Sequence, residues 1–227
     1  MLYDLYNHIS ALLALGGPVV TVIAGLSVVA LALIIVKIAE FQLCRIGNAR
    51  NAREAASLWQ QGRFAEAAAC VAQPKSAAEK ALRTTLTLLG RRTEKTDIEE
   101  QVSVLAMGDL HHFSKGVRAL EAIAQIAPLI GLFGTVLGMI DAFQALQSAG
   151  NNVDPSALAG GIWVALMTTA AGLGVAMPVS LVVTWLEARL EAERVATETL
   201  TSSVLLKQKT TSNKAGIQPG QQLAYAP

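Results

Sequence analysis

The sequence predicts an all-α integral membrane protein with three transmembrane helices, two of which extend into long cytoplasmic helices. The first observation is composition: 52% of the 227 residues are hydrophobic and only 15% are charged, with a mean hydropathy of +0.44. These values are too apolar for an ordinary soluble domain. The second is that three long apolar runs contain no charged residue. The third is that Lys and Arg are confined to two parts of the chain.

The first apolar run covers residues 18–36 and is long enough to cross roughly 30 Å of hydrocarbon. Before it, residues 1–17 place apolar side chains at helical spacing and predict a periplasmic helix that lies in the interface. The pair Gly16-Gly17 is expected to break that helix, and Pro18 is well placed to open the next. We interpret the run as a retained span, because no Lys or Arg precedes it and no small-x-small cleavage site follows it.

Residues 37–121 are predicted to form a cytoplasmic helical region. An alanine-rich, amphipathic stretch with helix ends at Gly62 and Pro74 indicates a helical hairpin. Thr96 to Glu99 match a capping box, which predicts the start of a long helix. That helix continues into a second transmembrane helix at 122–146. A periplasmic loop at 147–158, a third transmembrane helix at 159–186, a cytoplasmic helix at 187–206 and a disordered tail at 207–227 complete the expected order.

The distribution of positive charge predicts the orientation of the chain. Of the 18 Lys and Arg residues, 13 lie in 37–121 and the others follow residue 186, whereas none precedes residue 17 or separates the second and third spans. Cytoplasmic segments carry the excess of Lys and Arg. We therefore expect a periplasmic N-terminus and a cytoplasmic C-terminus.

Small residues form a stripe on each of the two later spans. Gly131, Thr135 and Gly138 share one helical face of the second span, and Gly134 with Gly138 adds a GxxxG spacing. The third span repeats the pattern with Gly161, Ala165, Thr168 or Thr169, Gly172 and Ala176. Such a stripe is either a tight packing seam or the wall of a narrow polar passage, because a hydroxyl in hydrocarbon needs a hydrogen-bond partner.

The later spans lack titratable side chains at membrane depth, since Asp141 follows the uncharged part of the second span. Residues 122–140 and 155–186 contain no Asp, Glu, Lys, Arg or His. A proton relay normally needs a titratable group in the membrane. If a complex containing this chain moves protons, another chain must bring the acid.

Other chemistries lack their motifs. The sequence has no GxxxxGK[ST] loop, which excludes ATP as the direct energy source, and no HExxH. The adjacent His111 and His112 are expected to be a solvated surface pair, and Cys44 and Cys70 are too few for a zinc or disulfide framework. We expect no enzymatic activity, cofactor, metal or nucleic-acid partner.

Residues 128–140 read PLIGLFGTVLGMI, and they are followed by ALMTTAAGL at 165–173 and then Pro178. This order of motifs resembles the MotA/TolQ/ExbB proton-channel family, closest to its ExbB and TolQ members. The resemblance implies an inner-membrane homo-oligomer, a pentamer, whose subunits surround partner helices. It also implies membrane lipids, a single-span ExbD/TolR-like protein with an intramembrane aspartate, and a TonB-like or TolA-like protein as partners.

The resemblance also assigns residues. Thr135 and Thr169 match threonines that face the partner's acid, and with Thr168 they form the expected proton-pathway and partner-facing set. The expected helix-packing residues are Pro128, Gly131, Gly134, Gly138, Gly161, Ala165, Gly172 and Pro178. ExbB and TolQ members commonly carry a glutamate before the second threonine, where this chain has Trp163-Val164-Ala165.

The resemblance implies a stator or proton-channel subunit that couples the proton motive force to outer-membrane transport through a TonB-like partner. Two alternatives stay open. One is a TolQ-type motor subunit for envelope maintenance, and the other is a membrane scaffold that conducts no ions. Three spans argue against a flagellar motor, whose MotA members usually have four.

Overall fold

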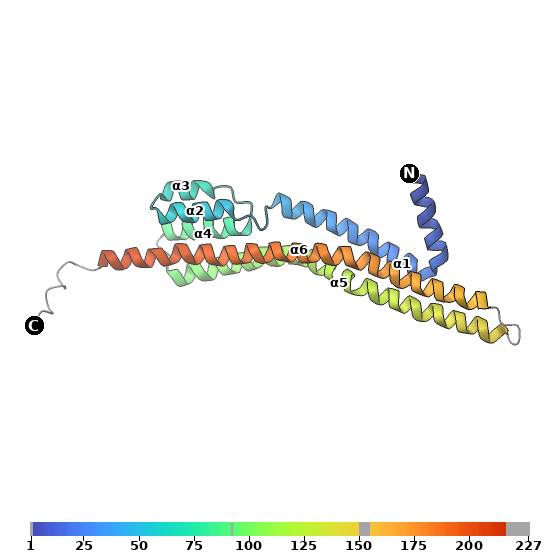
Figure 1. The fold of residues 1–227 in the computed structure, drawn as a ribbon. Helices are drawn as coiled ribbons and strands as arrows, with labels where there is room; N and C mark the ends of the chain where they lie inside the picture. The colour runs from blue at the N-terminus through green and yellow to red at the C-terminus, as the bar shows by residue number, and fades with distance from the viewer. Residues whose placement is uncertain (1, 92, 150–154, 217–227) are drawn as a thin grey trace, which may run out of the picture. The chain divides into compact units, whose positions relative to one another are not determined.

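The computed structural model describes residues 2–91, 93–149 and 155–216. Within these ranges every regular element is a helix, which confirms the all-α prediction (Figure 1). The chain divides into two compact units: unit 1 comprises Met1–Ala39 and Lys115–Leu186, and unit 2 comprises Glu40–Ser114 and Glu187–Pro227. The helices are α1 (Leu2–Leu43), α2 (Arg50–Gln60), α3 (Phe64–Cys70), α4 (Ala77–Gly90), α5 (Lys95–Ala149) and α6 (Pro155–Gly216).

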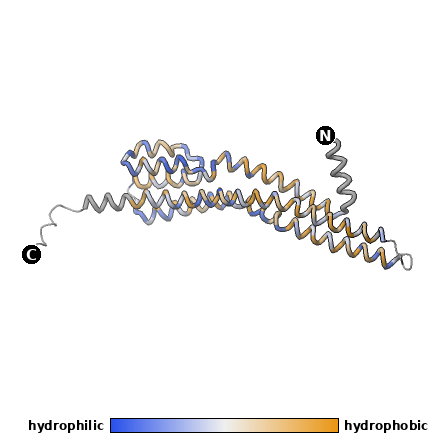
Figure 2. The backbone as a smooth tube through the Cα atoms, viewed as in Figure 1, coloured by the Kyte–Doolittle hydropathy of each residue, from blue (hydrophilic) through white to orange (hydrophobic). Residues whose placement is uncertain are grey.

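Three helices are long and apolar enough to cross a membrane, as the sequence predicts. The candidate spans lie in Gly17–Leu43, Lys95–Ser148 and Leu158–Leu206. Figure 2 shows the apolar residues along α1, α5 and α6, whereas α2 is largely hydrophilic. The expected tail at 207–227 falls partly on α6, which reaches Gly216, and residues 217–227 lie outside the described ranges.

The first helix breaks where the sequence predicts. Gly17 has φ 65° and ψ −164°, which is not helical, and Pro18 follows it. A positive φ favours glycine because it has no Cβ to clash with the backbone. The side chains of residues 2–16 lie outside the described part of the chain, so the predicted interfacial helix at 1–17 stays a prediction.

Within unit 1, α1 runs antiparallel to α5. Val19 Cγ1 lies 2.9 Å from where a Cβ on Gly134 would sit, and a Cβ on Gly116 would overlap the Lys37 side chain. The α1 face between these two contacts buries Ile23 and Ala30. Lys37 is only 8% exposed, so its methylene stem covers apolar surface beside Gly116.

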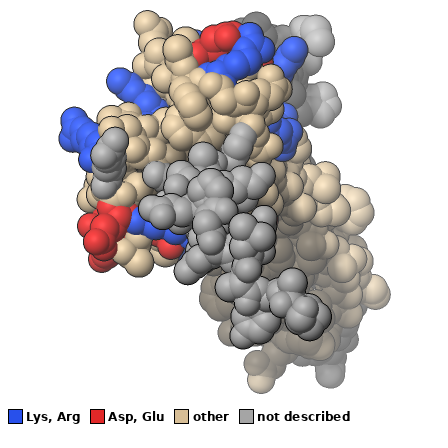
Figure 3. Space-filling view, turned by 90° about the vertical axis from the view of Figure 1, so that its left-hand side faces the viewer, with Lys and Arg blue, Asp and Glu red and all other residues tan. Residues whose placement is uncertain are grey.

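Unit 2 is built on an alanine-rich core that joins its helices. α2 ends at Gln60 and is followed by Gly62 (φ 85°), and Pro74 lies between α3 and α4, so both predicted helix ends are confirmed. The Trp59 and Phe64 rings pack edge to face, with their centroids 4.5 Å apart. The core includes Ala52, Ala55, Ala67, Leu82, Ile98, Ala196, Val204 and Leu205. Figure 3 shows Lys and Arg interspersed with Asp and Glu on one face of the molecule.

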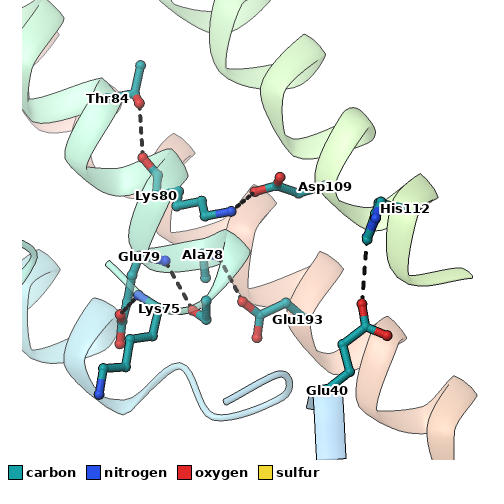
Figure 4. Close-up of polar contacts among 10 residues, drawn as sticks. Glu40, Lys75, Ala78, Glu79, Lys80, Thr84, Asp109, His112 and Glu193 are labelled. Atoms are coloured by element: carbon teal, nitrogen blue, oxygen red, sulfur yellow. Dashed lines mark hydrogen bonds and ion pairs between the residues drawn. The ribbon is translucent and has the colours of Figure 1, made fainter. Parts of the chain in front are cut away.

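The capping box predicted at Thr96 is wrong. α5 begins at Lys95, and the Ile98 N–H donates to the Glu94 carbonyl at 3.1 Å, so Thr96 lies inside the first turn. A side-chain N-cap is instead formed at the start of α4, where the Glu79 N–H donates to Ser76 Oγ at 3.2 Å. The Glu79 carboxylate accepts from the Lys75 N–H at 2.7 Å (Figure 4). These bonds satisfy donors that a helix start leaves free.

A buried carboxylate on α6 connects three segments of unit 2. Glu193 is 1% exposed and accepts from the Gly47 N–H at 2.8 Å. It also accepts from the Ala78 N–H at 2.8 Å (Figure 4). Gly47 has φ 80°, and a Cβ there would lie 2.8 Å from Arg189 Cδ, so a glycine is required. A buried charge is stable only when hydrogen bonds replace its water.

We expect Glu193→Gln to lower the free energy of unfolding by about 1–3 kcal/mol, because the amide leaves one backbone donor facing an NH₂ group. Thermal unfolding of the purified protein in mild detergent measures the change. The matched control is Glu198→Gln on the same helix, whose carboxylate is 67% exposed. Equal stability of the two variants would contradict the role given to Glu193.

Candidate functional site

The central feature of unit 1 is a seam where the backbones of α5 and α6 nearly touch. A Cβ on Gly172 would lie 2.6 Å from the Ala127 carbonyl oxygen, and a Cβ on Gly131 would lie 2.9 Å from the Thr168 carbonyl oxygen. No real Cβ fits at such distances from backbone. Only glycine permits this close approach. In lipid the hydrophobic effect does not drive helices together, so the van der Waals contacts of closely packed backbones must stabilise the pair.

The seam continues along both helices in one antiparallel register. Gly134 lies against Thr168, since a Cβ on Gly134 would be 2.6 Å from Thr168 Oγ1. A Cβ on Gly138 would be 3.1 Å from Ala165 Cβ. At the far end, a Cβ on Gly161 would be 2.5 Å from Ala142 Cβ. All five glycines expected to pack therefore lie in one seam, together with Ala165, which is 2% exposed.

Two hydroxyl groups of α6 share one carbonyl of α5. Thr168 Oγ1 lies 2.7 Å from the Ala165 oxygen and 3.2 Å from the Gly131 oxygen, so its single proton is shared between these two acceptors, and Thr169 Oγ1 donates to the same Gly131 oxygen at 3.2 Å. Thr168 is 2% exposed, whereas Thr169 is only partly buried. A hydroxyl that donates keeps lone pairs that can accept a further hydrogen bond.

Thr135 lies outside this group. Its hydroxyl donates to the Leu132 carbonyl of its own helix at 2.6 Å, and its side chain is partly exposed. The structure therefore separates the three predicted threonines: Thr168 and Thr169 bond across the seam, and Thr135 lies beside it.

The remaining expected packing residues differ in exposure. Pro128 is partly buried inside α5, whereas Pro178 is exposed in α6. Sequence reasoning missed Ala127 and Ala142 as seam residues. Their signal was present, because they lie four residues before Gly131 and four after Gly138 and so extend the same stripe.

The seam is uncharged, and the outer side of α5 is apolar. Large side chains are exposed along this helix, which suits lipid or a neighbouring chain. In the described residues, no three His, Cys, Asp or Glu side chains form a group that could hold a metal ion. The exposed apolar residues are Leu129, Leu132, Phe133, Val136, Ile140 and Phe143.

Comparisons with known proteins identify the same region. A sequence model described as the MotA/TolQ/ExbB proton channel family matches residues 73–199, more than half of the chain. Biopolymer transport protein exbB1 of Vibrio cholerae is 40% identical over 85 residues, which cover 37% of each chain. A putative biopolymer transport protein ExbB homolog of Methanothermobacter thermautotrophicus is 38% identical over 102 residues, 45% of this chain and 34% of the relative.

The Tol-Pal system protein TolQ of Haemophilus influenzae is 38% identical over 89 residues, which cover 39% of each chain. The matched stretch thus spans less than two fifths of the length of each of these three relatives.

The seam predicts opposite outcomes for two glycines that lie two residues apart. Gly172→Ala should destabilise the α5–α6 contact by about 1–3 kcal/mol, because the new methyl group meets backbone. Gly174→Ala, which meets nothing within 4 Å, should be neutral or stabilising, since alanine favours helix. Thermal unfolding in detergent compares them, and a Gly172→Ala protein as stable as wild type would contradict the seam.

Proposed function

The chain belongs to the MotA/TolQ/ExbB proton channel family, and we propose that it is a proton-channel subunit of an inner-membrane motor of the ExbB/TolQ type. The observation that carries the proposal is the uncharged α5–α6 seam with its threonine hydroxyls. A seam of this kind supplies hydroxyl groups at membrane depth but no proton acceptor of its own. It fits a protein that surrounds a charged helix of another chain.

The missing acid defines the partner. Because residues 122–140 and 155–186 contain no titratable side chain, the acid must come from another chain. The family resemblance implies a single-span ExbD/TolR-like protein with an intramembrane aspartate as that chain. An aspartate in a low-dielectric passage is stabilised by hydroxyl donors when ionised, and it donates to hydroxyl oxygens when protonated. Hydroxyl groups that donate to backbone carbonyls can accept from the protonated acid, and they would have to rotate away from those carbonyls to donate to the ionised one.

The three threonines have different roles in this proposal. Thr168 is too buried to reach a partner and holds α6 against the Gly131 carbonyl. Thr135 and Thr169 are partly exposed, and they are the groups we assign to the partner's acid. Thr169 orients its oxygen by donating to Gly131, so its lone pairs face away from that carbonyl.

We further propose that the chain forms a homo-oligomer, a pentamer by its family resemblance. The exposed apolar side chains of α5 support this, because they offer a surface for neighbouring copies and for lipid. The segregation of Lys and Arg supports a periplasmic N-terminus and a cytoplasmic C-terminus.

The process that we assign is energising of outer-membrane transport through a TonB-like partner, since the relatives from Vibrio cholerae and Methanothermobacter carry biopolymer-transport names. A TolQ-type role in envelope maintenance, with a TolA-like protein as partner of this chain, is the second candidate, and the relative from Haemophilus influenzae supports the TolQ-type role by its name. A scaffold that conducts no ions is the third, supported by Trp163-Val164-Ala165 in place of the family's usual glutamate.

The decisive variants replace hydroxyl groups by methyl groups of nearly the same shape. Thr135→Val should leave the oligomer intact and abolish most energised uptake, because a hydrogen bond to a buried acid contributes about 1.5–3 kcal/mol. Thr168→Val should lower seam stability by about 0.5–1.5 kcal/mol. Size-exclusion elution in mild detergent measures whether the oligomer is intact, and complementation of a deletion strain measures uptake. Thermal unfolding in the same detergent measures the stability of the seam.

Thr184→Val is the matched control, since this exposed hydroxyl donates to the Ser180 carbonyl of its own helix and to no other helix within the described residues. Two growth readouts separate the processes: growth on a substrate that requires energised uptake, and resistance to detergent. Loss of uptake alone supports the TonB-like assignment, and loss of detergent resistance alone supports the TolQ-type role. Full activity of Thr135→Val in both assays would favour the scaffold.

A further inference from the structure

The connection between α1 and α2 forms an open pocket of about 510 Å³ in unit 2. Its two arginines and one glutamate give a formal charge of +1, and in the described part of the chain neither arginine forms an ion pair. Unpaired guanidinium groups beside amide side chains make a site for an anion. The lining residues are Arg45, Asn48, Arg50, Asn51 and Glu54.

Backbone hydrogen bonds fix the wall that carries Arg45. The Ile46 N–H donates to the Phe41 carbonyl at 3.0 Å and the Arg45 N–H to the Gln42 carbonyl at 3.2 Å, the pattern of a Schellman motif. Arg45 has φ 51° at the position where glycine is preferred. The left-handed conformation at Arg45 ends α1 and turns the chain toward α2.

The opposite wall is the first turn of α2. Ala49 at the N-cap provides no side-chain acceptor, and the first turn contains no acidic residue. Asn48 Oδ1 accepts from the Arg50 N–H at 3.4 Å. The positive end of this helix therefore adds to the charge of the arginines.

Other charged groups near the pocket do not reverse its net positive charge. Arg53 follows on α2, and Arg189 donates from Nη1 to the Ile46 carbonyl at 3.4 Å. The Glu193 carboxylate is occupied by the Gly47 and Ala78 N–H groups. Glu54 is the acid that lines the pocket, and it opposes anion binding.

The position in the chain indicates where the anion comes from. The uncharged apolar run of α1 ends at residue 36, and the helix continues to Leu43 before Arg45 follows. The nine residues from 37 to Arg45 rise roughly 13 Å along a helix, so Arg45 lies outside the hydrocarbon, and its long side chain extends back toward the phospholipid headgroups. Basic clusters directly after a span attract anionic lipids.

We propose that the α1–α2 pocket binds a phosphate group, supplied by an anionic phospholipid of the adjacent leaflet, with Arg45 and Arg50 as its contacts. A planar guanidinium offers paired donors that match phosphate oxygens. The assignment of that leaflet to the cytoplasmic side rests on the proposed orientation, whereas the site itself does not. A soluble phosphate is the other source with the same chemistry.

The test uses the full chain purified in a nonionic detergent. The double variant Arg45→Asn/Arg50→Gln removes both charges, and asparagine tolerates the left-handed conformation at position 45. The matched control, Arg83→Gln/Arg91→Gln, removes two exposed charges of α4 and its C-terminus. Equal melting temperatures of the three proteins establish that the fold is kept.

Native mass spectrometry measures retention of phosphatidylglycerol against phosphatidylcholine, and calorimetry measures binding of inorganic phosphate and glycerol 3-phosphate. We expect the double variant to bind phosphatidylglycerol about tenfold more weakly, with the control unchanged. Glu54→Gln should bind it more tightly. A loss confined to the soluble phosphates would overturn the lipid assignment, and equal binding by all proteins in both assays would overturn the site. Neither readout requires transport, so failure here leaves the proposed function standing.

Discussion

The Gly131 carbonyl is the point on which the transmembrane part of the chain depends. It accepts hydrogen bonds from Thr168 and Thr169 because no side chain at position 131 holds α6 away. In lipid, apolar side chains gain little from leaving their solvent, so close backbone packing and hydroxyl bonds must hold helices together. The glycine spacing and the threonine pair are therefore one device: the glycines allow the approach, and the hydroxyls fix its register.

The helices of unit 2 are held together by a buried apolar core and a buried carboxylate. This core consists largely of alanine, which buries little area per residue and leaves small differences between alternative packings. Glu193 adds the specificity that alanine lacks, because its two oxygens each take a backbone N–H from a different segment. A buried carboxylate is tolerated here because it is fully bonded, whereas the seam of unit 1 contains no charge at all.

The features that sequence predicted are those with local signals. Hydropathy identified the three spans, and small residues at helical spacing identified the seam, because both depend on side chains within a few turns. Thr96 and Ser76 both begin a capping-box motif, and the motif alone does not decide between them. The burial of Lys37 against Gly116 joins residues far apart in the chain, so no local pattern could predict it. Glu193 bonds Gly47 across 146 residues, which no local pattern reveals.

Separating the threonines also required the structure, since neighbouring residues on a helix differ by about 100° in direction. That rotation leaves Thr168 inside the seam and Thr169 at its edge. The central claim is that this chain supplies packing and hydroxyl groups while a partner supplies the proton acceptor. Proton flux into liposomes under a clamped membrane potential tests it most directly. Vesicles with this chain alone should leak no faster than empty vesicles and should conduct only with the partner present; specific flux through the chain alone would contradict the claim.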